Sequence, residues 1–327
     1  MSQTTSLHIV SEFLKSKGAT HSAGSWEFLL TQRIIPAITD HQITNDELIT
    51  LLLSFEECGH QHVFLYTCKK NKAIELMDRD RIYAILKKID LEDLPNNPRV
   101  LNQPPVPEIV DVRWDAAKVD LSLTIKEVSL RKYERYIGSE QHDGKTHKIY
   151  GVVEARAVNT AKLHKNGLLE IRISSISNSS KYETEIFRFW SKIKSLIPSD
   201  DFSELSLSVA KERFWTERKE LQDIIRYSDS TIRDEAGNAL RAVTGSNKSD
   251  LSINPAVGHS LDYLLKQDKN AYCEGANIWF KQSNEISNDT HVLLTGEPNE
   301  FALPANCNEG DYNHVLSQLR HFNRRIS

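Results

Sequence analysis

The sequence predicts an α+β fold, in which a mainly helical N-terminal domain precedes a predominantly antiparallel sheet packed by amphipathic helices. Three observations predict it: apolar residues recur at helical spacing in the first ninety or so residues, short strand-like segments follow one another from Ile109 to Ile176, and helical spacing returns between Ser180 and Ile197. Parallel strands need long crossover connections. Strands in direct succession therefore indicate antiparallel pairing.

The N-terminal segments carry clear helix signals. Segments 7–14 and 26–34 each place apolar residues on one helix face, and Pro36 is expected to stop the second helix. Thr44 and Glu47 have the spacing of a capping box, in which each side chain bonds the other residue's backbone N–H. We therefore expect a helix to begin after Thr44.

A strand and a further helix complete this first part. The run 60–68 is rich in aromatic and β-branched residues and predicts a strand, and Asp78 is placed to cap a helix over the following residues. Five prolines then fall between Leu94 and Pro107, a density that helices and central strands do not tolerate. We therefore expect a boundary here, between a helical domain 1–94 and an α+β domain 107–327 that is divisible near residue 200.

The second part alternates strands and helices. The amphipathic stripe of 180–197 predicts a helix against the sheet, and a longer charged helix is expected over 206–225. The last helix is expected over 311–322. Strands are expected in 109–114, 119–125, 148–158 and 168–176, with a hairpin turn at 164–167, and again in 231–243, 276–282 and 291–303.

Composition bounds the class of protein. The 327 residues are 39% hydrophobic and 26% charged with a formal net charge of −4, which excludes collagen-like and disordered chains and gives no global positive field. The four cysteines show no metal-binding or disulfide-scaffold spacing, and the first residues resemble no signal peptide. We expect a soluble cytoplasmic protein that lies outside membranes.

The motifs of common enzymes are missing. The sequence contains no phosphate-binding loop, no dinucleotide fingerprint and no G-x-S-x-G nucleophile elbow. We therefore favour a non-enzyme, and we assign no catalytic residue and no cofactor.

Two patterns raise the question of a metal. Cys58, His60 and His62 alternate along a predicted strand, but no second pair of ligands accompanies them, so no metal site is assigned. Glu154 and Glu170 each lie two residues before an arginine on neighbouring predicted strands, which could place both carboxylates on one sheet face for a metal-dependent nuclease. The competing interpretation is a ladder of cross-strand ion pairs.

Local basic segments are the candidates for nucleic-acid contact. Lys162 and Lys165 lie at the tip of the predicted hairpin, and Arg320, Arg324 and Arg325 lie at the C-terminus. All five are expected to have few acidic neighbours, so that they can contact phosphates without breaking ion pairs. Cations on the helix over 206–225 alternate with glutamates, which favours ion pairs along that helix instead.

The sequence thus favours a binding or adaptor protein that contacts nucleic-acid backbone through these segments as part of a larger assembly. A metal-dependent nuclease and a purely protein-binding scaffold are the alternatives. The partners left open are DNA or RNA, another protein, or a second copy of the chain.

Overall fold

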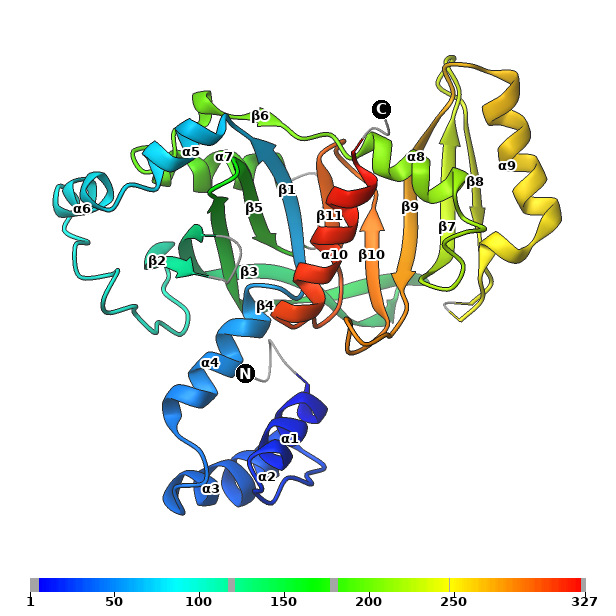
Figure 1. The fold of residues 1–327 in the computed structure, drawn as a ribbon. Coiled ribbons are helices and arrows are strands. Elements are labelled where there is room, and N and C mark those ends of the chain that lie inside the picture. The colour runs from blue at the N-terminus through cyan, green and yellow to red at the C-terminus, as the bar shows by residue number, and fades with distance from the viewer. Residues whose placement is uncertain (1–5, 117–120, 177–181, 247, 325–327) are drawn as a thin grey trace. The chain divides into compact units, whose positions relative to one another are not determined.

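The computed structural model describes residues 6–116, 121–176, 182–246 and 248–324, and Figure 1 shows its ribbon. The described residues form helices and a large antiparallel sheet, which confirms the α+β class. The chain divides into two compact units: unit 1 contains residues 1–65 and 204–327, and unit 2 contains residues 66–203. The stretch 95–107 forms neither helix nor strand. Its role as a domain boundary stays a prediction.

The N-terminal helices of unit 1 are α1 (Leu7–Ser16), α2 (Trp26–Leu29) and α3 (Ile35–Thr39), with a π-helical turn, Leu30–Ile34, between the last two. The expected stop at Pro36 is wrong. Pro36 lies in the first turn of α3, directly after the π-helical turn, and the backbone stays helical through it. These helices enclose a core of their own, made of Val10, Leu14, Ala19, Leu29, Ile34, Ala37 and Ile43.

The expected capping box opens α4 (Asn45–Glu56). The Glu47 N–H lies 3.2 Å from Thr44 Oγ1, and the Thr44 N–H donates to Glu47 Oε2 at 2.8 Å. Because both bonds connect residues three positions apart, the sequence alone could specify them.

Unit 1 also contains antiparallel strands in the order β1-β11-β10-β9-β7-β8. Phe214 of α8 (Ser208–Thr216) packs against the rings of Phe280 on β9 and Phe322 on α10 (Glu309–Phe322), at centroid distances of 6.2 and 4.9 Å. Both helices therefore cover one face of these strands. The bounds are β1 (Gln61–Thr67), β7 (Ile225–Arg233), β8 (Ala239–Val243), β9 (Tyr272–Phe280), β10 (Thr290–Leu294) and β11 (Glu300–Leu303).

Two helical expectations in unit 1 need correction. The helix expected over 206–225 is shorter, Ser208–Thr216; turns follow over 217–224, and Ile225 already belongs to β7. Helix α9 (Pro255–Gln267) lies between the expected strands 231–243 and 276–282, where no helix was expected, and the Asn254 side chain caps its N-terminus. Within the described ranges, no helix combines the length and apolar character needed to cross a membrane.

Unit 2 contains antiparallel strands in the order β2-β3-β4-β5. Strands lie in all four expected segments, although residues 119 and 120 of the second segment lie outside the described residues. β3 and β4 are far longer than expected. Helix α7 buries Phe189 and Ile193, as its stripe predicted, and the Asp78 side chain caps α6. The bounds are α5 (Lys70–Leu76), α6 (Arg79–Lys87), β2 (Glu108–Ala116), β3 (Leu121–His142), β4 (Lys145–His164), β5 (Leu168–Ser174) and α7 (Tyr182–Ile193). A short strand, β6 (Ser203–Glu204), lies where the two units meet in the sequence.

Candidate functional site

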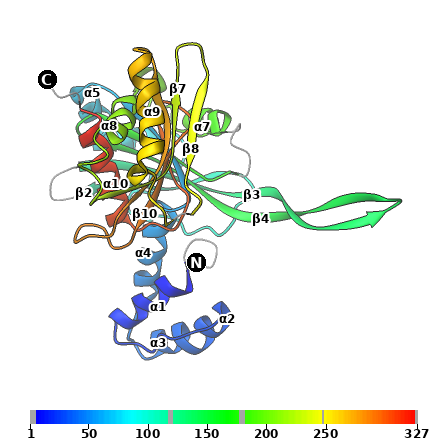
Figure 2. The ribbon, with the colours of Figure 1, turned by 90° about the vertical axis from the view of Figure 1, so that its right-hand side faces the viewer.

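Strands β3 and β4 continue as a two-stranded ribbon beyond the other strands of unit 2 (Figure 2). β2 pairs with β3 only as far as Val128, and β5 pairs with β4 only from Thr160 onward. Residues 132–154 therefore form a ribbon to which no described residue adds a third strand. We call this segment the arm.

The geometry of the arm is set by its turn and by one bulge. Asp143 and Gly144 have φ angles of 50° and 70°, as a two-residue type I′ hairpin turn requires. Ile137 is an extra residue between the paired Tyr136 and Gly138, and its side chain lies over Gly151, where an added Cβ would meet it at 3.3 Å. Such bulges increase the local twist of a ribbon.

The arm exposes apolar and aromatic side chains. Tyr136 and Tyr150 are each 52% exposed and form an edge-to-face pair at 5.9 Å, while Ile137 and Val152 are 65% and 69% exposed. Four Lys or Arg residues are balanced by four Asp or Glu residues over 132–154. An isolated hairpin is only marginally stable in water, and exposed apolar clusters mark interaction surfaces. The arm therefore has the character of an interaction element with no basic bias.

A second feature of unit 2 is a polar layer on one side of its strands. The register places polar and charged side chains side by side there, and most of them are buried. Burying charges is costly unless they are paired. We call this layer the polar face; it comprises Asp111, Arg113, Asp115, Ser122, Thr124, Lys126, Thr160, Lys162, His164, Glu170 and Arg172.

Hydrogen bonds and ion pairs organise the polar face. Asp115 accepts from Arg113 at 2.8 Å and from the Thr124 hydroxyl at 2.6 Å. Glu170 is fully buried and lies 2.9 Å from Arg172 Nη2 and 2.5 Å from His164 Nε2. The first set of contacts joins β2 to β3, and the second joins β4 to β5.

The predicted cations of unit 2 have different surroundings. Lys162 belongs to the polar face, with its side chain 13% exposed and its Nζ 3.7 Å from Asp115 Oδ2, so the expectation that it has few acidic neighbours is wrong. Lys165 lies in the turn between β4 and β5, is exposed, and forms no ion pair with the described residues. Of these two lysines, Lys165 is the one available for phosphate contact without loss of an ion pair to a described residue.

The predicted cations of unit 1 lie at the end of α10. Arg320 is half-buried within the helix and Arg324 is exposed just after it, and neither forms an ion pair with another described residue. Arg325 lies outside the described residues. By contrast, the cations of α8 are engaged: Arg213 pairs with Glu217 at 2.6 Å and Lys211 is 4% exposed.

The two glutamates of the nuclease interpretation do not meet. Glu170 lies in the polar face, whereas Glu154 lies on the arm and pairs with Lys132 at 2.8 Å. Lys162, directly opposite Glu170, is eight positions along β4 from Glu154, so the two carboxylates are separated by about 26 Å of strand. In the described ranges, no group of three His, Cys, Asp or Glu side chains could hold a metal ion.

The shared strand face expected for Cys58, His60 and His62 is not present. β1 begins only at Gln61, and His60 precedes it with a φ of 53°. The His60 ring bonds Asn306 at 3.1 Å, and His62 Nδ1 lies 2.5 Å from Glu300 Oε1. The two imidazoles therefore have separate partners.

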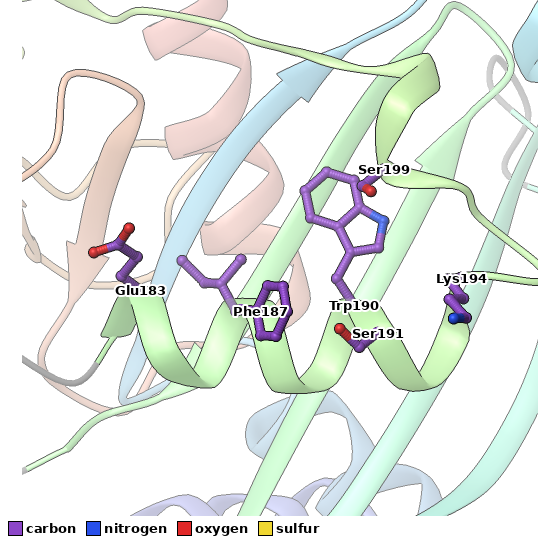
Figure 3. Close-up of a pocket in the computed structure, with 7 residues that line it drawn as sticks. Glu183, Phe187, Trp190, Ser191, Lys194 and Ser199 are labelled. Carbon is purple, nitrogen blue, oxygen red and sulfur yellow. The ribbon is translucent and has the colours of Figure 1, made fainter.

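A shallow hollow lies along α7 (Figure 3). Its volume is about 250 Å³, slightly below the range typical of small-molecule sites. Glu183 and Lys194 lie at the two ends of the hollow. Phe187, which is 75% exposed, lies between them, with Trp190 beside it. The hollow can accept a side chain of a bound partner, but it brings no acid–base pair together.

The arm was not expected from the sequence as a continuous hairpin. Its strands were expected only up to Ile125 and from Lys148. The Asp143-Gly144 pair was the available signal, because this dipeptide strongly favours a two-residue hairpin.

A comparison of the chain with protein-family models finds no match, and a comparison with curated proteins finds none either.

Proposed function

We propose that this chain is a non-enzymatic binding or adaptor protein, working in the cytoplasm, whose arm contacts a macromolecular partner. The observation that carries this proposal is the exposure of Tyr136, Tyr150, Ile137 and Val152 on a ribbon to which the described part of the chain adds no third strand. Tyrosines supply large contact areas at low entropic cost and are enriched in interfaces.

The charge of the arm favours a protein partner over nucleic acid. Its equal numbers of cationic and anionic residues give no net attraction to a phosphate backbone. Its unpaired strand edges suit strand addition, in which main-chain hydrogen bonds supply affinity. The hollow beside Phe187 in the same unit offers a further apolar contact.

Site-specific photo-crosslinking tests this proposal. A photoreactive phenylalanine replaces Tyr136 or Tyr150 in the full chain, and a matched control replaces Tyr263 of α9, which is 66% exposed. We expect a defined covalent complex from the arm positions and none from Tyr263. The captured protein is then purified, and it must bind the unmodified chain but not a chain that lacks the arm. Equal crosslinking at Tyr263, or binding that survives loss of the arm, would refute the proposal.

A second candidate function is contact with nucleic-acid backbone. It is favoured by Lys165, Arg320 and Arg324, which form no ion pair among the described residues and so can meet phosphates without breaking one. Lys162, by contrast, would first have to leave Asp115.

A salt titration tests the second candidate. Binding of a DNA duplex or single-stranded RNA of about 30 nucleotides is measured against salt, because each lost phosphate contact lowers the slope by roughly 0.7 to 0.9. The variant Arg320→Ala/Arg324→Ala should flatten the slope, whereas Arg213→Ala, already paired with Glu217, serves as the control. No binding at low salt, or an unchanged slope, would eliminate this function.

A further inference from the structure

The outer edge of β4 presents the backbone groups of its even-numbered residues. In an antiparallel ribbon, successive residues direct N–H and C=O alternately toward the partner strand and away from it. The Val158 N–H donates to Ser174 Oγ at 2.8 Å, on the side away from β3. The β3–β4 register is regular from Val158 to Tyr150, so Tyr150, Val152 and Glu154 also direct their N–H groups outward.

The sequence along this edge is complementary to itself. Residues 148–154 read Lys-Ile-Tyr-Gly-Val-Val-Glu, centred on Gly151. When a second copy of this segment is laid antiparallel about Gly151, Tyr150 faces Val152 and Ile149 faces Val153. Lys148 then faces Glu154. Each apolar residue meets an apolar one and each charge meets its opposite, and two-fold symmetry makes every such pair occur twice.

The backbone requirements agree with this register. The pairs joining Tyr150 with Val152, and Lys148 with Glu154, connect even-numbered residues, whose N–H and C=O groups point outward. Gly151 would face its own copy in a non-hydrogen-bonded pair, where Cα atoms approach most closely, to about 4.5 Å. Glycine has no side chain to obstruct that approach.

We propose that two copies of this chain pair antiparallel through the outer edges of their β4 strands, about a two-fold axis at Gly151, so that two arms form one four-stranded sheet. This inference rests on the proposed function of the arm and names its partner as a second copy. The pairing would satisfy the exposed strand edge, which otherwise invites uncontrolled association.

The first test uses a proline that removes one outward N–H. Val152→Pro deletes a donor that takes no part in the β3–β4 ladder, so the arm keeps its internal bonds while the proposed pairing loses two of its own. Val152→Thr is the matched control, because it keeps the N–H and the β-branched shape. Sedimentation equilibrium of the full chain from roughly 1 to 100 μM measures association. We expect the wild type and Val152→Thr to dimerise, and Val152→Pro to dissociate at least about tenfold more readily.

The second test exchanges charges. Lys148→Glu places like charges opposite each other twice and should weaken the dimer by about tenfold. Lys148→Glu/Glu154→Lys restores opposite charges in the proposed register and should recover most of that loss. Lys132 loses its partner in the double variant, but this pair is 61% and 50% exposed, so its contribution is small.

The outcomes separate this inference from the proposed function. A wild type that stays monomeric at roughly 100 μM, dimerisation of Val152→Pro equal to that of Val152→Thr, or no recovery in the double charge variant would each overturn the β4 pairing. Should the arm crosslink a different protein while the chain is monomeric, this inference fails and the proposed function stands. Should crosslinking at the arm equal that at Tyr263, the proposed function itself fails.

Discussion

Glu170 and His164 face each other at the end of the β4–β5 hairpin, with 2.5 Å between Glu170 Oε1 and His164 Nε2. Arg172 binds the second carboxylate oxygen through Nε and Nη2, at 3.1 and 2.9 Å. Glu170 is fully buried and Arg172 is 3% exposed. Because both side chains are buried, partners within the protein compensate their charges in place of water.

The Glu170→Ala variant should therefore destabilise unit 2 strongly. Removing one partner of a buried ion pair leaves an uncompensated charge, and we expect the free energy of unfolding to fall by about 3 kcal/mol or more. Urea denaturation followed by circular dichroism measures it.

Glu154→Ala is the matched control for that experiment. It removes a glutamate from the exposed pair with Lys132 and should change the free energy of unfolding by less than about 0.5 kcal/mol. A similar loss for both variants would contradict a structural role specific to the polar face.

The arm should be removable without unfolding the protein. We expect that replacing residues 134–152 with Asn-Gly, between the paired Tyr133 and Val153, keeps the register and changes the free energy of unfolding by less than about 1 kcal/mol. The physical reason is that Tyr136, Tyr150 and Val152 are exposed and add nothing to a core. Thermal unfolding of the trimmed and full chains measures the effect. A large drop in melting temperature would show that the arm stabilises the fold.

Elements defined by neighbouring residues were predictable from the sequence. The capping box at Thr44 and the helix after Asp78 depend on contacts three residues apart. The apolar residues of α7 recur at helical spacing because one face of that helix is buried. Helix α9 carried a comparable signal in Asn254 and Pro255, as an N-cap followed by a first-turn proline, which the interpretation passed over.

The arm and the polar face were harder to foresee, for different reasons. The arm has no buried face, so its strands lack the alternation of apolar and polar residues by which strands are recognised. The polar face depends on register: Lys162 meets Asp115 only because β4 and β2 both flank β3. Contacts between residues so far apart along the chain cannot be read from local patterns. Lys162, which was predicted to be a free cation, therefore proves to be a partner in an ion pair.

The four thiols should differ sharply in reactivity. Burial raises the pKa of Cys273 to about 11, and Cys58 and Cys307 are each 3% exposed. Cys68 is only partly buried, although burial and the charge of Asp201 raise its pKa as well. Since the thiolate is the reactive form, a disulfide reagent at pH 8 should label Cys68 slowly and the other three only after unfolding. Mass spectrometry of the labelled chain locates the sites, and rapid native labelling of Cys273 would contradict its buried environment.

His291 should make stability depend on pH in a defined direction. Its ring stacks on Trp279 at 4.4 Å, and its pKa is lowered, chiefly by burial and also by the positive charge of Arg226, while Asp229 opposes the shift. The unfolded chain therefore binds a proton at His291 more readily than the folded chain. Stability from this group is complete above the unfolded value of about 6.5 and is lost as pH falls from there toward the lower folded pKa.

The His291→Phe variant isolates this contribution. Phenylalanine keeps an aromatic ring on Trp279 but binds no proton, so we expect the wild type to lose more stability than the variant between about pH 6.5 and pH 5. The free energy of unfolding of both proteins is measured across that range, and an NMR titration of the His291 ring gives its folded pKa directly. Identical pH profiles, or a folded pKa at or above about 6.5, would show that burial does not disfavour the charged imidazole here.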